Sequence, residues 1–191
     1  GISIPAVYDG EEKQIVQKTM EGTWIFKGSE IPGKGFKTYL VCEDGTVSEE
    51  VVNMEITTSK MENQFFRLDY NEKGQFISIY DKRAKRQLLK PGQAANVIMS
   101  YEDRPHNYDA WDVNNYYTEK SWEIDDVSSL EVVENGPVRG CVRIERRYLD
   151  SMITQFVFIY REIPRIRKSR SAGLTSSWLL FSVIHTPSPA Q

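Results

Sequence analysis

Hydrophobic and polar residues alternate along most of this chain with a period of two, which is typical of β-strands. Phe36–Val41 alternates in this way. Phe65–Tyr70 and Gln75–Tyr80 flank the polar segment Asn71–Gly74, and this arrangement predicts a β-hairpin. Val97–Tyr101 predicts a further strand.

The second half of the chain contains two longer strand patterns. Val138–Leu149 predicts a strand with one largely apolar and one largely charged face. Met152–Tyr160 is apolar on both faces, and only the short break Asp150–Ser151 separates it from the first, so we expect the two to pair. Glu11–Met20 fits a short helix and a pair of strands equally well. No other window has a helical period, and the fold class is therefore predicted to be all-β.

The pattern also suggests a division of the chain. Residues 1–57 are expected to form a small β-domain, and the polar segment Thr57–Lys60 joins it to a larger sheet system over residues 61–166. The first portion contains Trp24, Phe26, Phe36 and Tyr39, which we expect in the core or between the two portions. Residues 167–191 contain three basic residues and no acidic one, and are interpreted as a divergent tail that is partly disordered.

Charge excludes some functions. The 24 basic and 27 acidic residues are mixed along the chain and give a net charge of -3, which provides no broad cationic surface for nucleic acid or an anionic membrane. The basic run Lys82–Arg86 is interpreted as a solvated turn. No apolar run is long enough to cross a membrane. Cys42 and Cys141 are too few for a disulfide framework, which favours a reducing, cytoplasmic location.

The segment Glu102–Trp122 is the most unusual in composition, because aromatic, acidic and basic residues alternate there between two strands. Aromatic rings can stack on the C–H face of a sugar while Asp and Arg side chains bind its hydroxyls, so this loop is a candidate wall of a glycan pocket. The alternative is structural: Trp111 caps the core, and Asp109 and Asp112 bind loop amides. The candidate residues are Asp103, Arg104, His106, Tyr108, Asp109, Trp111 and Asp112.

Three segments, in this order, carry a resemblance to a known family. Ile31–Tyr39 resembles a strand of a small β-domain, Met61–Lys82 contains an "ENxFF" strand followed by a "SIYDK" hairpin, and Tyr101–Asp112 contains "EDRP" and "YDAWD". Together they resemble the C-terminal β-domains of family 38 glycoside hydrolases, the α-mannosidases of bacterial and cytosolic type. The resemblance covers about residues 1–166.

The resemblance implies a truncated, supersandwich-like (galactose-mutarotase-like) β-sandwich preceded by a small β-domain. It also implies a retaining α-mannosidase that acts on mannose-containing glycans, in which an N-terminal domain supplies the catalytic aspartate and binds a divalent metal, usually zinc. The chain begins at Gly1 without an initiator methionine, so we expect it to be a fragment whose catalytic domain lies elsewhere in the same polypeptide.

The chain itself lacks the residues for that chemistry. Retaining hydrolysis uses two carboxylates about 5 Å apart, and the metal site of this family uses two histidines with two aspartates. Only His106 and His185 are present, and His185 lies in the divergent tail. We therefore predict no catalytic, cofactor-binding or metal-binding residue in this chain, although a different metal site of His106 with Asp103, Asp109 or Asp112 is an alternative.

After Ile166 the sequence departs from the family pattern, which suggests a frame change or a truncated gene. Uncovered sheet edges would then favour homo-oligomers. Three functions remain open: a scaffold for the catalytic domain with one loop near the glycan, a self-standing carbohydrate-binding sandwich, and a protein-interaction sandwich without sugar chemistry.

Overall fold

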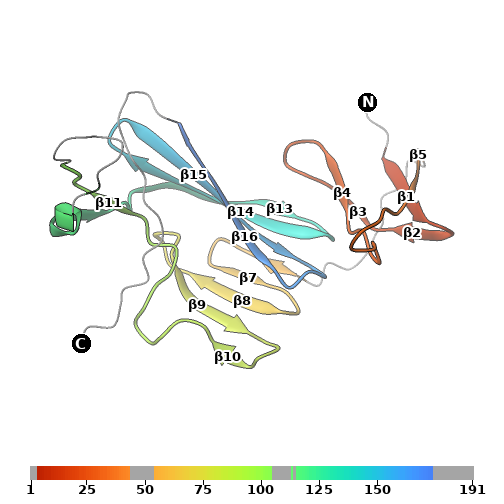
Figure 1. Cartoon of the computed structure of the whole chain (residues 1–191), viewed down its shortest axis with the longest axis horizontal. Coiled ribbons are helices and arrows are strands. Elements are labelled where there is room, and N and C mark those ends of the chain that lie inside the picture. Colours follow the sequence, from red (N-terminus) through yellow and green to blue (C-terminus); the bar gives the residue numbers. More distant parts are fainter. Residues whose placement is uncertain (1–3, 44–53, 105–112, 114, 174–191) are drawn as a thin grey trace.

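The computed structural model describes residues 4–43, 54–104, 113 and 115–173. These residues form strands β1 to β16 and one short 3-10 helix, which confirms the all-β prediction (Figure 1). In the same part of the chain, no helix is long and apolar enough to span a membrane.

The N-terminal portion consists of short strands. β1 (Pro5–Asp9) lies between β2 (Glu12–Gln14) and β5 (Leu40–Glu43), and β3 (Val16–Lys18) pairs with β4 (Trp24–Phe26). The two-strand interpretation of Glu11–Met20 is therefore the one that the structure adopts.

The expected strand Phe36–Val41 is wrong over its first four residues, because β5 begins only at Leu40. A turn over Pro32–Gly35 precedes this segment, with Gly35 N–H donating to the Pro32 carbonyl. Lys37 and Tyr39 contact Ser29, and their side chains also reach Asp9 of β1 and Phe26 of β4 without backbone pairing, while the Phe36 side chain is 85% exposed. The alternation therefore reflects a loop that packs one side against its neighbours.

A five-stranded sheet of order β10-β9-β8-β7-β6 follows. Its strands are β6 (Glu55–Ile56), β7 (Lys60–Glu62), β8 (Phe66–Tyr70), β9 (Phe76–Asp81) and β10 (Arg86–Gln87). The predicted hairpin is confirmed as β8 and β9, and the Asn71 side chain closes its turn by accepting from the amides of Lys73 and Gln75.

The longest strands form a four-stranded sheet of order β13-β14-β15-β16. They are β13 (Val127–Asn135), β14 (Arg139–Tyr148), β15 (Ser151–Tyr160) and β16 (Ile166–Gly173). The expected pairing of the two long strands is confirmed as β14 with β15. β16 extends the same sheet across residue 166, where the divergent tail was expected to begin.

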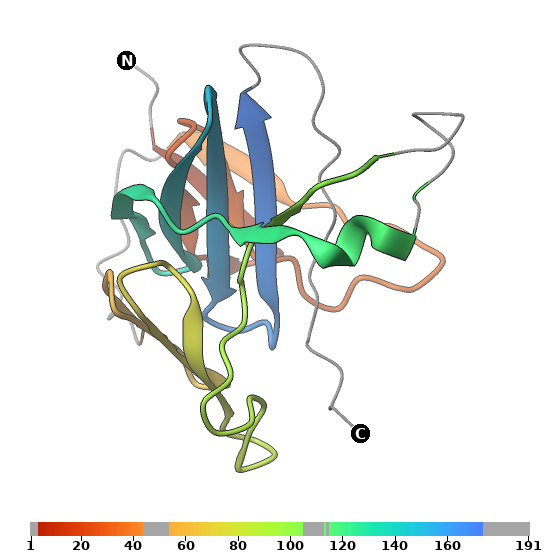
Figure 2. The same ribbon diagram turned by 90° about the vertical axis from the view of Figure 1, so that its left-hand side faces the viewer.

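A two-stranded ribbon of β11 (Met99–Tyr101) and β12 (Ser121–Glu123) lies, with the 3-10 helix η1 (Asn115–Glu119), at the end of the molecule away from the N-terminal strands (Figure 1). In Figure 2 this ribbon and η1 cross in front of the four-stranded sheet. A small apolar cluster of Ile98, Ile124 and Ile153 holds the ribbon on β15, and Ser100 shares a 2.6 Å hydrogen bond with Tyr148.

The main core lies between the five-stranded and the four-stranded sheet. The sheets approach closely at Gly140, where a Cβ atom would come 2.4 Å from Ile56 Cδ1, and at Gly74, where it would come 2.8 Å from Ile144 Cγ2. Glycine is required at both positions because any side chain would separate the two layers. The buried residues of this core are Met54, Ile56, Met61, Leu68, Tyr70, Phe76, Val142, Ile144, Val157 and Ile159.

Candidate functional site

The N-terminal strands contact the four-stranded sheet through one buried amide. Gln17 on β3 is 4% exposed, and its Oε1 accepts from the backbone amides of Val138 and Arg139, each at 2.8 Å. Its Nε2 donates to the Arg139 carbonyl at 3.0 Å. Gly136 leaves the space for this side chain, since a Cβ there would come 2.3 Å from Gln17 Cδ.

A buried ion pair completes this contact. Glu134 on β13 accepts from Arg139 Nε at 2.6 Å and from its second guanidinium nitrogen at 2.8 Å. It also accepts from the Met20 amide at 3.0 Å and from Gln17 at 3.4 Å. The hydrogen bonds to Glu134 raise the pKa of the Arg139 guanidinium. We refer to Gln17, Met20, Glu134, Gly136, Val138 and Arg139 as the joint.

A groove of about 230 Å³ opens beside the joint, and Val138 belongs both to the joint and to the wall of the groove. Ile15 and Ile163 form apolar parts of its wall, and Lys27 and Glu162 contribute an ion pair of 2.6 Å. Such a lining can hold a polar ligand or fix the angle between the two portions. Of its two carboxylates, Glu12 and Glu162, the second is held in the ion pair with Lys27.

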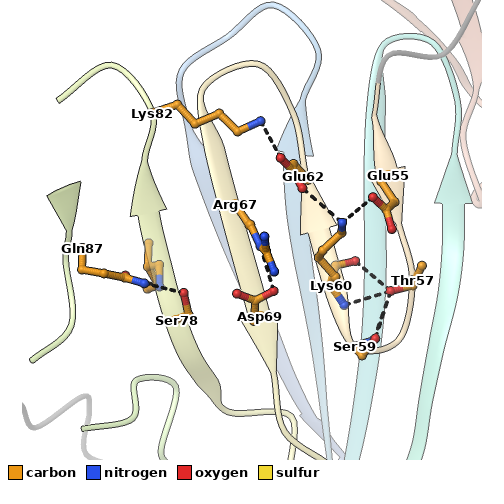
Figure 3. Close-up of polar contacts among 11 residues, drawn as sticks. Glu55, Thr57, Ser59, Lys60, Glu62, Arg67, Asp69, Ser78, Lys82 and Gln87 are labelled. Atoms are coloured by element: carbon orange, nitrogen blue, oxygen red, sulfur yellow. Dashed lines mark hydrogen bonds and ion pairs between the residues drawn. The ribbon is translucent and has the colours of Figure 1, made fainter. Parts of the chain in front are cut away.

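The outer face of the five-stranded sheet is polar, and its charges are matched (Figure 3). Lys60 bonds both Glu55 and Glu62, which raises the pKa of Lys60. Glu62 also pairs with Lys82 at 2.7 Å, and the hydrogen bond from Lys82 is the main reason that the pKa of Glu62 is lowered. A face with each charge balanced by a neighbour is a solvated surface rather than a site.

Two of the seven predicted loop residues lie in the described part of the chain. Asp103 and Arg104 follow β11 and are exposed, and Arg104 pairs with Glu102 at 2.8 Å. His106, Tyr108, Asp109, Trp111 and Asp112 lie outside the described residues, so the glycan-proximal loop stays a prediction.

Two aromatic side chains on the described flank of that loop face solvent. Tyr116 on η1 is 66% exposed and Trp122 on β12 is 50% exposed. Tyr117 instead packs edge-on against Tyr101, with ring centroids 5.3 Å apart. The segment Glu102–Trp122 thus presents aromatic surface on its described side.

The described residues contain no cluster of three or more His, Cys, Asp or Glu side chains that could hold a metal ion. Cys141 is buried and Cys42 is exposed, and both are free thiols. Burial raises the pKa of Cys141 to about 12, which makes it a poor nucleophile.

Sequence reasoning did not find the joint. Its two sides, Gln17 with Met20 and Glu134 with Arg139, are 114 to 122 positions apart, and an isolated Gln, Glu or Arg carries no periodic signal. The one local signal was the turn Asn135–Pro137, whose glycine makes room for Gln17.

Known proteins share both sequence and fold with this chain. An 85-residue stretch, 44% of the chain, is 29% identical to "Alpha-mannosidase G" of Dictyostelium discoideum, and the match spans 8% of that protein. The crystal structure of an alpha-mannosidase from Enterococcus faecalis V583 superposes with a TM-score of 0.54 at 14% identity, over 89% of this chain and 24% of that one. The chain thus spans a minor part of the length of either protein. Residues 61–169 match the C-terminal domain of glycosyl hydrolases family 38, and the chain belongs to that family.

Proposed function

We propose that this chain is a non-catalytic β portion of a retaining, metal-dependent α-mannosidase that hydrolyses terminal α-mannosides. In this role it buttresses a catalytic domain located elsewhere in the same polypeptide, in the cytoplasm. The observation that carries the proposal is the family match over residues 61–169. The relatives, both named as α-mannosidases, are several times longer than the region they share with the chain.

The composition of the chain supports a non-catalytic role. It contains two histidines, His106 and His185, and a centre of two histidines with two aspartates would need both. Because His185 lies in the segment after Ile166 that departs from the family pattern, we place the metal in the catalytic domain. The joint supports a buttressing role, because it fixes two β portions into one unit through buried hydrogen bonds.

The first test is an assay of the chain alone with p-nitrophenyl α-mannoside and added zinc. We expect no hydrolysis and no zinc retained after dialysis. Hydrolysis accompanied by metal bound to the chain's own side chains would refute the non-catalytic role.

The second test expresses the chain together with its upstream coding region. The longer polypeptide is expected to hydrolyse the aryl mannoside, and Gln17→Ala should shorten its activity half-life on heating, because the β portions are no longer held together. Gln87→Ala is the control, since the Gln87 side chain is exposed and, among the described residues, bonds only the Ser78 hydroxyl and the Ile79 amide. A longer polypeptide that is inactive, or equally stable with either variant, would contradict the proposal.

Direct contact with the glycan is a second candidate function, favoured by the exposed rings of Tyr116 and Trp122. Titration with methyl α-mannoside, followed by NMR, should then show binding that weakens in Tyr108→Ala, Trp111→Ala and Trp122→Ala. Binding that is the same in these variants as in the unaltered chain, or no binding at all, would leave the scaffold role alone.

A further inference from the structure

Three cationic side chains share one face of the four-stranded sheet. Arg146 on β14 lies opposite Ile153, and Arg170 and Lys168 on β16 lie opposite Gln155 and Val157. Residues directly opposite one another, and residues two positions apart along a strand, point to the same side. This is the inner side, because the neighbouring residues Val157 and Ile144 belong to the main core.

Arg146 is 1% exposed and contacts only uncharged acceptors in the described part of the chain. Its guanidinium bonds Gln155 Oε1 and donates to the Lys73 carbonyl at 2.6 Å. The Gln155 and Asn96 side chains bond each other reciprocally, at 3.1 and 3.3 Å. These amides satisfy the geometry of the guanidinium but do not balance its charge.

Lys168 continues the same network. Its Nζ donates to Asn96 Oδ1 at 3.0 Å, again an uncharged acceptor. The Arg170 side chain is exposed and forms no hydrogen bond or ion pair with the other described side chains, and it approaches both other cations closely enough to repel them. Burial lowers the pKa of Arg146 to about 10. Burial also lowers the pKa of Lys168, and repulsion from Arg170 adds to that effect.

The nearby acidic groups are already engaged. Glu123 on β12 is the carboxylate that most affects Arg146, and it accepts from Gln75 at 2.6 Å and from Lys73 at 3.3 Å. Asp125 also pairs with Lys73, at 2.6 Å. The cations Arg146, Lys168 and Arg170 therefore outnumber the carboxylates available to them among the described residues.

We propose that Arg146, Lys168 and Arg170 form a binding site for a small oxyanion, a phosphate or a carboxylate. The exposed Arg170 guanidinium meets the anion from solvent, Lys168 supplies an ammonium donor, and the buried Arg146 contributes a fixed positive charge behind them. Bound anion would offset the burial of these cations and their mutual repulsion, because charge-assisted hydrogen bonds to an anion replace contacts with neutral amides. The proposed anion site has no assigned role in α-mannoside cleavage.

The test is a titration of the chain with sodium phosphate and, separately, with sodium acetate, at constant ionic strength maintained with sodium chloride. We expect a saturable heat of binding in calorimetry and a rise of several degrees in the unfolding temperature, because a ligand that binds only the folded state stabilises it. Binding of phosphate alone identifies a free ion as the ligand, and binding of acetate as well extends the site to carboxylates.

Two variants make the result specific. Arg170→Gln should weaken phosphate binding at least tenfold, while Arg86→Gln, the same substitution at an exposed arginine of β10, should leave it unchanged. Lys168→Met should also abolish the response, and it provides a second measurement should Arg170 prove to contribute to folding. Absence of saturable binding, equal binding in Arg170→Gln, or an equal loss in Arg86→Gln would overturn the proposal.

Discussion

Replacing Glu134 by glutamine tests whether the joint stabilises the chain. The Glu134 side chain is 2% exposed and its partner Arg139 is 13% exposed, so the substitution leaves a buried guanidinium without its counter-charge. The hydrogen bond to the Met20 amide and the second bond to Arg139 are weakened at the same time. Breaking a buried pair from one side typically costs about 3 to 5 kcal/mol, and we expect a loss of this size in the free energy of unfolding.

The measurement is urea unfolding followed by tryptophan fluorescence, with Glu131→Gln as the matched control. Glu131 lies on the same strand and pairs with Arg143 at 2.9 Å, but its side chain is 54% exposed, so its removal should change stability far less. A double variant, Glu134→Gln with Arg139→Met, should recover part of the loss because no unpaired charge remains. Equal losses for Glu134→Gln and Glu131→Gln would refute the reasoning.

Four further outcomes follow from the core and the thiols. Gly140→Ala should destabilise the chain by about 1–3 kcal/mol through overpacking against Ile56, and Ile56→Ala in the same chain should restore part of it, both read from urea midpoints. Leu68→Ala should cost about 2–5 kcal/mol through the cavity it leaves in the main core, and a loss below 1 kcal/mol would mean that the two sheets do not share that core. A thiol reagent at pH 8 should label one cysteine, Cys42, in the folded chain and two after denaturation. Because the pKa of Cys141 is raised from 9.0 to about 12 on folding, the unfolded chain loses this proton first, and the free energy of unfolding should fall as the pH rises through that interval.

Local patterns predicted the long elements well. The hairpin of β8 and β9 and the pairing of β14 with β15 could be read from alternation and turn residues, because neighbouring strands joined by short turns depend on nearby sequence. The segment Phe36–Tyr39 alternates as well, but it contacts Ser29, Asp9 and Phe26 through side chains and forms no ladder. Alternation reports which side chains face a neighbour, not whether the backbone pairs with it.

The sequence pattern did not predict the polar contacts between residues far apart in the chain. Phe26 and Tyr39, expected in the core or between the two portions, are half-buried and their ring centroids lie 4.9 Å apart, whereas Phe36, for which the same was expected, is largely exposed. Arg146 could be placed on an apolar face from its position in β14, but its partners Gln155 and Lys73 come from other strands and turns. Such partners are selected by tertiary packing, which a strand pattern does not encode.

The contact made by Gln17 constrains substitution unevenly on its two sides. On the four-stranded sheet it recognises the peptide groups of Val138 and Arg139 rather than the Val138 side chain, so residue 138 can vary without loss of these hydrogen bonds. On β3, in contrast, truncating the Gln17 side chain removes all of them at once. Substitutions in the turn between β13 and β14 are therefore tolerated as long as Gly136 is kept. On the opposing strand β3, the Gln17 side chain must be kept, because its length and its amide make the contact.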